Sequence, residues 1–168
     1  QGYYGVATLP VIIRNVLENP TWYTSYTPYQ AEISQGRLEA LLNFQTMVSS
    51  LTAMDIANAS LLDEATAGAE AMIMMYNARS RDKVKAGANR FLVDNSVFMQ
   101  TRDVLITRAA PLGIDIQFVD YTQIEPDEQL FGVLVQYPAA NGEIRDYRDM
   151  VEKVHGAGAL AGVGADLM

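Results

Sequence analysis

The sequence of 168 residues contains no cysteine and a single histidine, His155. The lack of cysteine excludes disulfides, thiolate nucleophiles and thiolate zinc sites, and it fits a reducing compartment. A Ser-His-Asp triad or a histidine-rich metal site would have to be built around His155 alone. We therefore expect no metal ion. We expect a structural role for His155, which lies in the last turn of a predicted helix, at the negative end of its dipole.

Basic charge and long apolar runs are also scarce. The net charge is −8 at pH 7, and this field repels phosphate backbones, so we expect no nucleic-acid partner. No apolar run approaches the ~20 residues of a membrane helix, so we expect no membrane partner. No secretory signal is visible at the N-terminus. The content of 49% hydrophobic and 19% charged residues is typical of a globular domain with a real core.

The second half of the sequence alternates apolar strand patterns with helical ones. We predict strands over residues 91–93, 114–119, 132–136 and 160–163. A helix over 100–109 and another around 147–154 separate some of them. Strands joined by single helices favour right-handed crossovers, so these strands should be neighbours in a mainly parallel sheet between helices. The predicted fold class is α/β.

The first half predicts helices and loops. Residues 11–19 form a short predicted helix that Pro20 ends, and residues 21–34 form an aromatic loop. Ser34 is expected to cap the next helix, and Asp63 to cap a largely buried helix that runs to about Ala78. Residues 57–62 fit a strand or a turn, and residues 80–89 a polar surface loop.

Glycines at 156, 158 and 162 resemble a dinucleotide-binding loop, but a dinucleotide loop follows a strand and opens a helix. Here the glycines follow a predicted helix and lead into a strand. We expect them to end the helix and to allow close packing at the entry to the strand.

Three segments are candidates for ligand binding, and each has a structural alternative. The helix start at 63–70 has free N–H groups for a phosphate, yet Asp63 and Glu64 also suit a plain cap. The loop 26–32 gathers phenols, an amide and a carboxylate, either to shape a pocket or to pack on itself at an interface. Asp166 follows the last strand, where a carboxylate can pair with a pyridinium or be merely solvated.

Several stretches are similar to one enzyme family. These are residues 26–39, Tyr-Thr-Pro-Tyr-Gln-Ala-Glu-Ile-Ser-Gln-Gly-Arg-Leu-Glu, residues 43–47, Asn-Phe-Gln-Thr-Met, and residues 58–64, Asn-Ala-Ser-Leu-Leu-Asp-Glu. Gly2-Tyr3-Tyr4, Gln136-Tyr137-Pro138 and Ala165-Asp166-Leu167 extend the match in one register. Together they resemble the N-terminal half of the glycine cleavage system P-protein (glycine dehydrogenase, decarboxylating), which depends on pyridoxal phosphate (PLP).

This resemblance implies a partial large domain of the fold-type-I PLP transferases over residues 36–168, preceded by a helix and an aromatic active-site loop over residues 1–35. The whole enzyme would decarboxylate glycine with PLP and pass the aminomethyl group to the lipoyl arm of the H-protein. Its partner would be a C-terminal half or a second P-protein subunit. The compartment would be the bacterial cytoplasm or the mitochondrial matrix.

The resemblance also assigns roles to residues. Tyr26, Tyr29, Gln30 and Glu32 would wall the active site. The cofactor-binding positions would be Ala65, Thr66, Phe98 and Asp166, with Thr66 at a phosphate-binding turn, Phe98 as the ring-stacking residue and Asp166 as the pyridinium partner. Alanine at 65, phenylalanine at 98 and Met99 in place of proline depart from the family pattern. These departures suit a vestigial pocket.

No catalytic residue is expected in this chain, because in the family the Schiff-base lysine belongs to the C-terminal half. Lys83, Lys85 and Lys153 are the lysines here, and we expect all three at the surface. The segment alone, which we expect to be cut from a longer protein, should bind no PLP and be inactive. The alternative function is that of a purely structural pseudo-half, a scaffold for the PLP-bearing half.

Overall fold

The computed structural model describes residues 3–27, 30 and 32–167 of the chain. Packing divides the chain into two compact units. The larger unit comprises Leu61–Asp166 with Tyr3, and the smaller comprises Tyr4–Ser60 with Leu167. The helices α1 (Pro10–Leu17) and α2 (Arg37–Thr52) both belong to the smaller unit.

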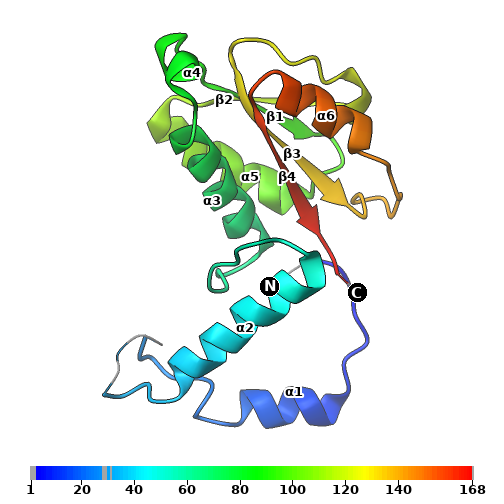
Figure 1. Cartoon of the computed structure of the whole chain (residues 1–168). Helices are drawn as coiled ribbons and strands as arrows, with labels where there is room; N and C mark the ends of the chain where they lie inside the picture. Colours follow the sequence, from blue (N-terminus) through cyan, green and yellow to red (C-terminus); the bar gives the residue numbers. More distant parts are fainter. Residues whose placement is uncertain (1–2, 28–29, 31, 168) are drawn as a thin grey trace. The chain divides into compact units, whose positions relative to one another are not determined.

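A four-stranded sheet forms the centre of the larger unit (Figure 1). Its strands are β1 (Arg90–Asp94), β2 (Asp115–Val119), β3 (Leu130–Tyr137) and β4 (Leu160–Ala165), in the order β2-β1-β3-β4. All neighbouring strands are parallel. The predicted parallel α/β sheet is therefore confirmed.

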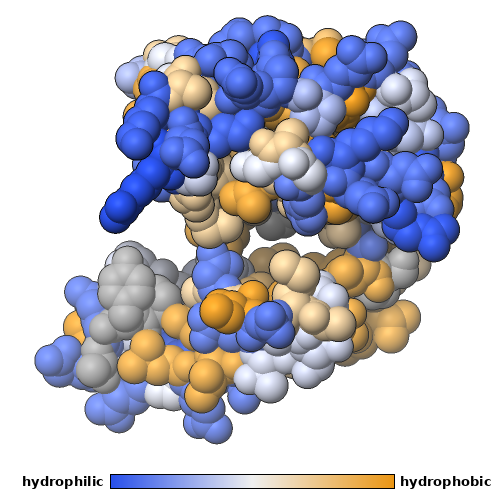
Figure 2. All heavy atoms as spheres, turned by 45° about the horizontal axis from the view of Figure 1, so that its top comes forward, coloured by the Kyte–Doolittle hydropathy of each residue, from blue (hydrophilic) through white to orange (hydrophobic). Residues whose placement is uncertain are grey.

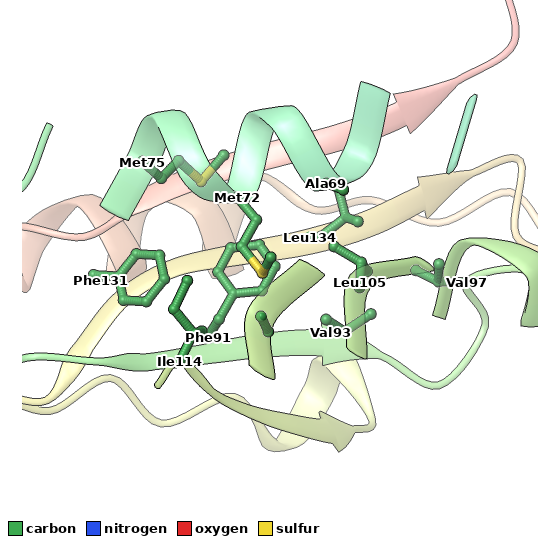
Figure 3. Close-up of a cluster of buried hydrophobic side chains, with 11 residues drawn as sticks. Ala69, Met72, Met75, Phe91, Val93, Val97, Leu105, Ile114, Phe131 and Leu134 are labelled. Carbon is green, nitrogen blue, oxygen red and sulfur yellow. The ribbon is translucent and has the colours of Figure 1, made fainter. Parts of the chain in front are cut away.

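Helices cover both faces of this sheet. Helices α3 (Glu64–Asn77) and α5 (Met99–Ala109) pack on one face, and α6 (Arg148–Gly156) packs on the other. Figure 3 shows the first of these cores, where Met72 and Met75 of α3 lie over Phe91 and Phe131. Phe91 is fully buried and stacks on Phe131 with ring centroids 5.4 Å apart. Each such side chain stabilises the fold by roughly 1.5–3 kcal/mol.

Helix α3 begins where the sequence predicts. The Asp63 side chain accepts a hydrogen bond from the Thr66 backbone N–H at 2.7 Å, as an N-cap residue does. The helix is less buried than expected. Ala65, Ala69, Met72 and Met75 face the core, but Met74 is 66% exposed.

Residues 80–89 are not the polar surface loop that the sequence predicts. They contain the short helix α4 (Arg81–Lys85), capped by Ser80. The expectation of three surface lysines is also wrong for Lys83, which is 9% exposed. Its Nζ donates to the backbone oxygens of Asp127 at 3.0 Å and Glu128 at 3.2 Å. A lysine can be buried here because two carbonyl groups satisfy its ammonium.

Helix α6 ends at Gly156, and Gly158 has a φ of +68° before β4 begins. These glycines therefore end a helix and precede a strand, as predicted. The short 3-10 helices η1 (Ala110–Leu112) and η2 (Tyr121–Gln123) flank β2. Within the described residues, no helix is both long and apolar enough to cross a membrane.

The smaller unit contains α1 (Pro10–Leu17) and α2 (Arg37–Thr52). Ser34 does not cap α2 as predicted, because its hydroxyl donates to the Thr27 carbonyl at 2.7 Å and Gly36 takes the N-cap position. Neither helix buries a residue. Figure 2 shows the resulting hydrophobic surface over this unit. Its exposed large apolar residues include Ile12, Val16, Leu17, Trp22, Leu42, Met47 and Leu51.

Candidate functional site

The carboxyl edge of the sheet is the natural place for a ligand. From β1 the chain moves outward to β2, then returns across β1 to β3 and β4, so its direction switches between β1 and β3. Ligands of open parallel sheets bind outside the carboxyl ends of the strands at such a point. Asp166 follows β4 at this edge, is half-buried, and donates its backbone N–H to the Tyr137 oxygen at 2.9 Å.

The first turn of α3 is hydrogen-bonded within the chain. Ala65 is fully buried. Hydrogen bonds from the backbone N–H and the hydroxyl of Thr66 lower the pKa of Asp63. One backbone N–H of the predicted phosphate-binding turn, that of Thr66, therefore already donates a hydrogen bond to a carboxylate of the chain.

Glu64 in the same turn joins three elements. Its Oε1 accepts from Gln136 Nε2 at 2.7 Å, and its Oε2 accepts from the Tyr3 backbone N–H at 3.2 Å. Gln136 of β3 is only 1% exposed and also donates to the Gly164 carbonyl of β4 at 3.0 Å. A Cβ on Gly164 would lie 2.9 Å from Gln136 Oε1, so a larger residue there would displace the Gln136 amide. The carboxylate of Glu64 is thus held at the helix start.

Phe98 is the N-cap residue of α5 and is half-buried. Its ring meets the Tyr3 ring edge-on, with centroids 5.8 Å apart and an interplanar angle of 79°. Burial and the Asp63 carboxylate raise the pKa of the Tyr3 phenol, against a hydrogen bond with the Ala65 backbone that lowers it. Tyr3 therefore contacts the starts of both α3 and α5. The sequence singled out Tyr3 only as part of the resemblance.

The aromatic loop belongs to the smaller unit. Tyr29 lies outside the described residues, whereas Tyr26, Gln30 and Glu32 are exposed there. Arg37 anchors the loop through its guanidinium, which donates to the backbone oxygens of Thr21, Trp22 and Tyr26. Arg37, the first residue of α2, was not singled out from the sequence, where it appears only within the stretch 26–39.

A charged network at the carboxyl end of β1 was also overlooked. Asp94 is 1% exposed and accepts from Arg145 at 3.0 Å and from the Tyr121 backbone at 2.9 Å. Burial lowers the pKa of Arg145, but the Glu143 hydrogen bond and the Asp94 charge outweigh it and raise that pKa. An open cleft of about 270 Å³ adjoins this network. Its signal in the sequence is the aspartate directly after the apolar run 91–93.

Schiff-base and metal chemistry find little support in the described part of the chain. Lys83 of α4 donates to backbone carbonyls that immediately precede β3, at the opposite edge of the sheet from Asp166, and Lys85 and Lys153 are exposed. The carboxylates and His155 form no group of three or more that could hold a metal ion within the described ranges. His155 is exposed near the end of α6.

Comparison with known proteins identifies the family. The family description "Glycine cleavage system P-protein" matches residues 1–168. A glycine dehydrogenase (decarboxylating) of Bacteroides fragilis is 56% identical over 167 residues, which cover 99% of this chain and 18% of that protein. One of Bacteroides thetaiotaomicron is 54% identical, with the same 99% and 18% coverage.

A solved structure of the same family is also similar to this chain. The crystal structure of a glycine decarboxylase (P-protein) of the glycine cleavage system, in inhibitor-bound form, superimposes with a TM-score of 0.76 at 32% identity. The match covers 92% of this chain and 35% of that one. The chain thus spans a minor part of the proteins that it matches. It belongs to the glycine cleavage system P-protein family.

Proposed function

We propose that the chain is part of a glycine dehydrogenase (decarboxylating). The complete protein decarboxylates glycine and passes the aminomethyl group to the lipoyl arm of the H-protein, in the cytoplasm of a bacterium. The observation that carries this proposal is the family match over residues 1–168 together with relatives of that name at 54–56% identity.

The proposed cofactor of the complete protein is PLP, which supplies an electron sink for the carbanion left after loss of CO2. The residues of this chain do not fit it. Asp63 and Glu64 place two carboxylates at the start of α3, and both already accept hydrogen bonds. Carboxylates at this position repel a phosphate. The chain also has no lysine at the carboxyl edge of the sheet among the described residues.

We therefore assign PLP to another part of the protein, in a C-terminal half or a second P-protein subunit. Ala65, Thr66, Phe98 and Asp166 remain as the vestige of a cofactor pocket in this chain. Family departures at Ala65 and Phe98, and the hydrogen bond that the Thr66 N–H makes to Asp63, support this assignment.

We propose that this chain contributes one wall of the active site. Tyr26, Tyr29, Gln30 and Glu32 carry the hydroxyl, amide and carboxylate groups that orient a small polar substrate such as glycine and keep water away from it. The exposure of Tyr26, Gln30 and Glu32 leaves them available to face another part of the protein. Arg37 fixes the backbone that carries Tyr26.

The test of the activity uses the complete protein. Glycine labelled at its carboxyl carbon is incubated with the PLP-loaded protein and lipoylated H-protein, and released CO2 is counted. We expect CO2 release that depends on H-protein. Its absence with a fully loaded, folded protein would rule out the proposed activity.

A second experiment distinguishes a chain that forms part of the active site from one that only supports the assembly of the protein. We expect Tyr26→Phe and Glu32→Gln each to reduce turnover at least tenfold while light scattering shows the same assembly. Tyr23→Phe, an exposed tyrosine of the same unit, is the matched control and should keep full turnover. If the first two variants alter only assembly, the chain acts as a scaffold.

A further inference from the structure

Tyr3 makes three contacts with the starts of α3 and α5. Its backbone N–H binds Glu64, 61 positions along the sequence. Its ring packs edge-on against Phe98, and the Ala65 backbone is a hydrogen-bond partner of its phenol. Glu64 and Ala65 belong to the first turn of α3, and Phe98 is the N-cap residue of α5.

Two of these partners are positions that the family resemblance assigns to a cofactor. Ala65 stands at the expected phosphate turn, and Phe98 at the expected ring-stacking position. An aromatic ring with a polar group at one end already lies between them. Tyr3 thus offers a ring to Phe98 and an oxygen to the start of α3.

The charges at the start of α3 also disfavour a bound cofactor phosphate there. The Thr66 N–H is bound by Asp63, and the Glu64 carboxylate is fixed by the buried Gln136 and by Tyr3. The positive end of the helix dipole therefore already has two carboxylates of its own. An added anion would meet two negative charges before it reached an N–H group.

We propose that Tyr3 fills, from within the chain, the space between the starts of α3 and α5, and that Asp63 and Glu64 close this space to anions. The pocket is occupied by the protein itself and is no second cofactor site. This inference rests on the proposed function in one respect, the assignment of the reaction centre to another part of the protein.

The experiment uses the complete PLP-loaded protein and two probes. The neutral probe is 4-fluorophenol, followed by fluorine NMR, because a space left by a removed ring takes up small aromatic molecules. We expect Tyr3→Ala to bind it at least tenfold more tightly than the unaltered protein. Tyr23→Ala, which removes a ring that is 62% exposed, is the control and should gain no binding. Equal binding by Tyr3→Ala and the unaltered protein overturns the proposal.

The anionic probe is inorganic phosphate, measured by calorimetry. Tyr3→Ala keeps both carboxylates and should gain no phosphate binding, whereas Tyr3→Ala combined with Glu64→Gln should bind phosphate at least tenfold more tightly than Tyr3→Ala. Equal phosphate affinity of the two variants would show that the carboxylate does not close the space. Both readouts are of binding, so a failure of glycine decarboxylation leaves them interpretable.

If Tyr3→Ala does not fold, nitration of the unaltered protein by tetranitromethane gives the answer. The reagent attacks accessible phenolates, and the half-buried Tyr3 contacts the starts of α3 and α5. We expect Tyr3 to be nitrated at least tenfold more slowly than in a free peptide with the sequence of residues 1–6, as read by peptide mass spectrometry. Equal rates overturn the proposal.

Discussion

Gln136 on β3 donates a hydrogen bond of 2.7 Å to the Glu64 carboxylate on α3, across 72 positions of sequence. Gln136 is almost completely buried, and its Nε2 also reaches the Gly164 carbonyl. Replacing it with an apolar residue leaves a carboxylate and a carbonyl without this donor. A buried polar group left unsatisfied costs about 1–3 kcal/mol.

We therefore expect Gln136→Leu to lower the free energy of unfolding by about 1–3 kcal/mol, as measured by urea denaturation. Gln117→Leu is the matched control. Gln117 is exposed on β2 and bonds only a neighbouring surface carboxylate, Asp115, in the described contacts. Equal effects of the two variants would show that the Gln136 bonds contribute little.

A second prediction concerns the space at Gly132 in β3. A Cβ there would lie 2.8 Å from Met75 Sδ and 2.9 Å from the Phe91 ring. Overpacking of a core costs typically 1–3 kcal/mol, so Gly132→Ala should lower the melting temperature clearly. Gly156→Ala is the control, because a Cβ at that position meets nothing within 4 Å. It should leave the melting temperature unchanged or slightly higher.

A third prediction concerns acid stability. Hydrogen bonds from Thr66 hold the pKa of Asp63 below its ordinary value, and hydrogen bonds from Arg148 lower the pKa of Asp146 to about 2. Because these folded-state pKa values lie below those of the unfolded chain, the stabilisation is complete above the unfolded value of about 4. The Asp146 contribution is lost as the pH falls through about 2, and the Asp63 contribution is lost as the pH falls through the lowered pKa of that carboxyl.

Melting temperatures between pH 7 and pH 2 test this dependence. Asp63→Asn keeps an N-capping oxygen but cannot titrate, so its melting temperature should fall less between pH 5 and pH 2 than that of the unaltered protein. Asp103→Asn, which replaces an exposed carboxylate on α5, serves as control and should follow the unaltered curve. A curve for Asp63→Asn that matches the unaltered one would contradict the prediction.

A fourth prediction concerns the lysines. Trapping PLP on the 168-residue chain with borohydride should give weak labels shared between Lys85 and Lys153, which are exposed to solvent. Lys83 should label least, because two backbone carbonyls hold its ammonium group. Peptide mass spectrometry locates the labels. One stoichiometric label, accompanied by CO2 release from glycine, would mean that this chain holds a complete site.

A fifth prediction concerns association. Exposed apolar side chains on α1 and α2 favour contact with another surface, so the 168-residue chain should form a dimer or a larger assembly. Ile12→Asp places a charge on the apolar part of α1 and should weaken association, whereas Asn15→Asp should not. Light scattering at increasing concentration distinguishes these results. A monomer at high concentration would contradict the prediction.

The sequence alone determined the parts of this protein that depend on neighbouring residues. Apolar runs predicted the four strands, and their spacing predicted the parallel sheet, because periodicity is a local property. Asp63 was identified as an N-cap because a cap and its partner lie within one turn. The glycines after α6 were assigned correctly for the same reason.

Only the tertiary structure decided the contacts between distant positions. Lys83 became buried because Asp127 and Glu128, far along the chain, supply its acceptors. The surroundings of Glu64 and Phe98 were likewise set by distant residues, Gln136 for Glu64 and Tyr3 for Phe98. Hydrogen-bonding residues are compatible with many partners, and packing of the sheet and helices selects which of them meet.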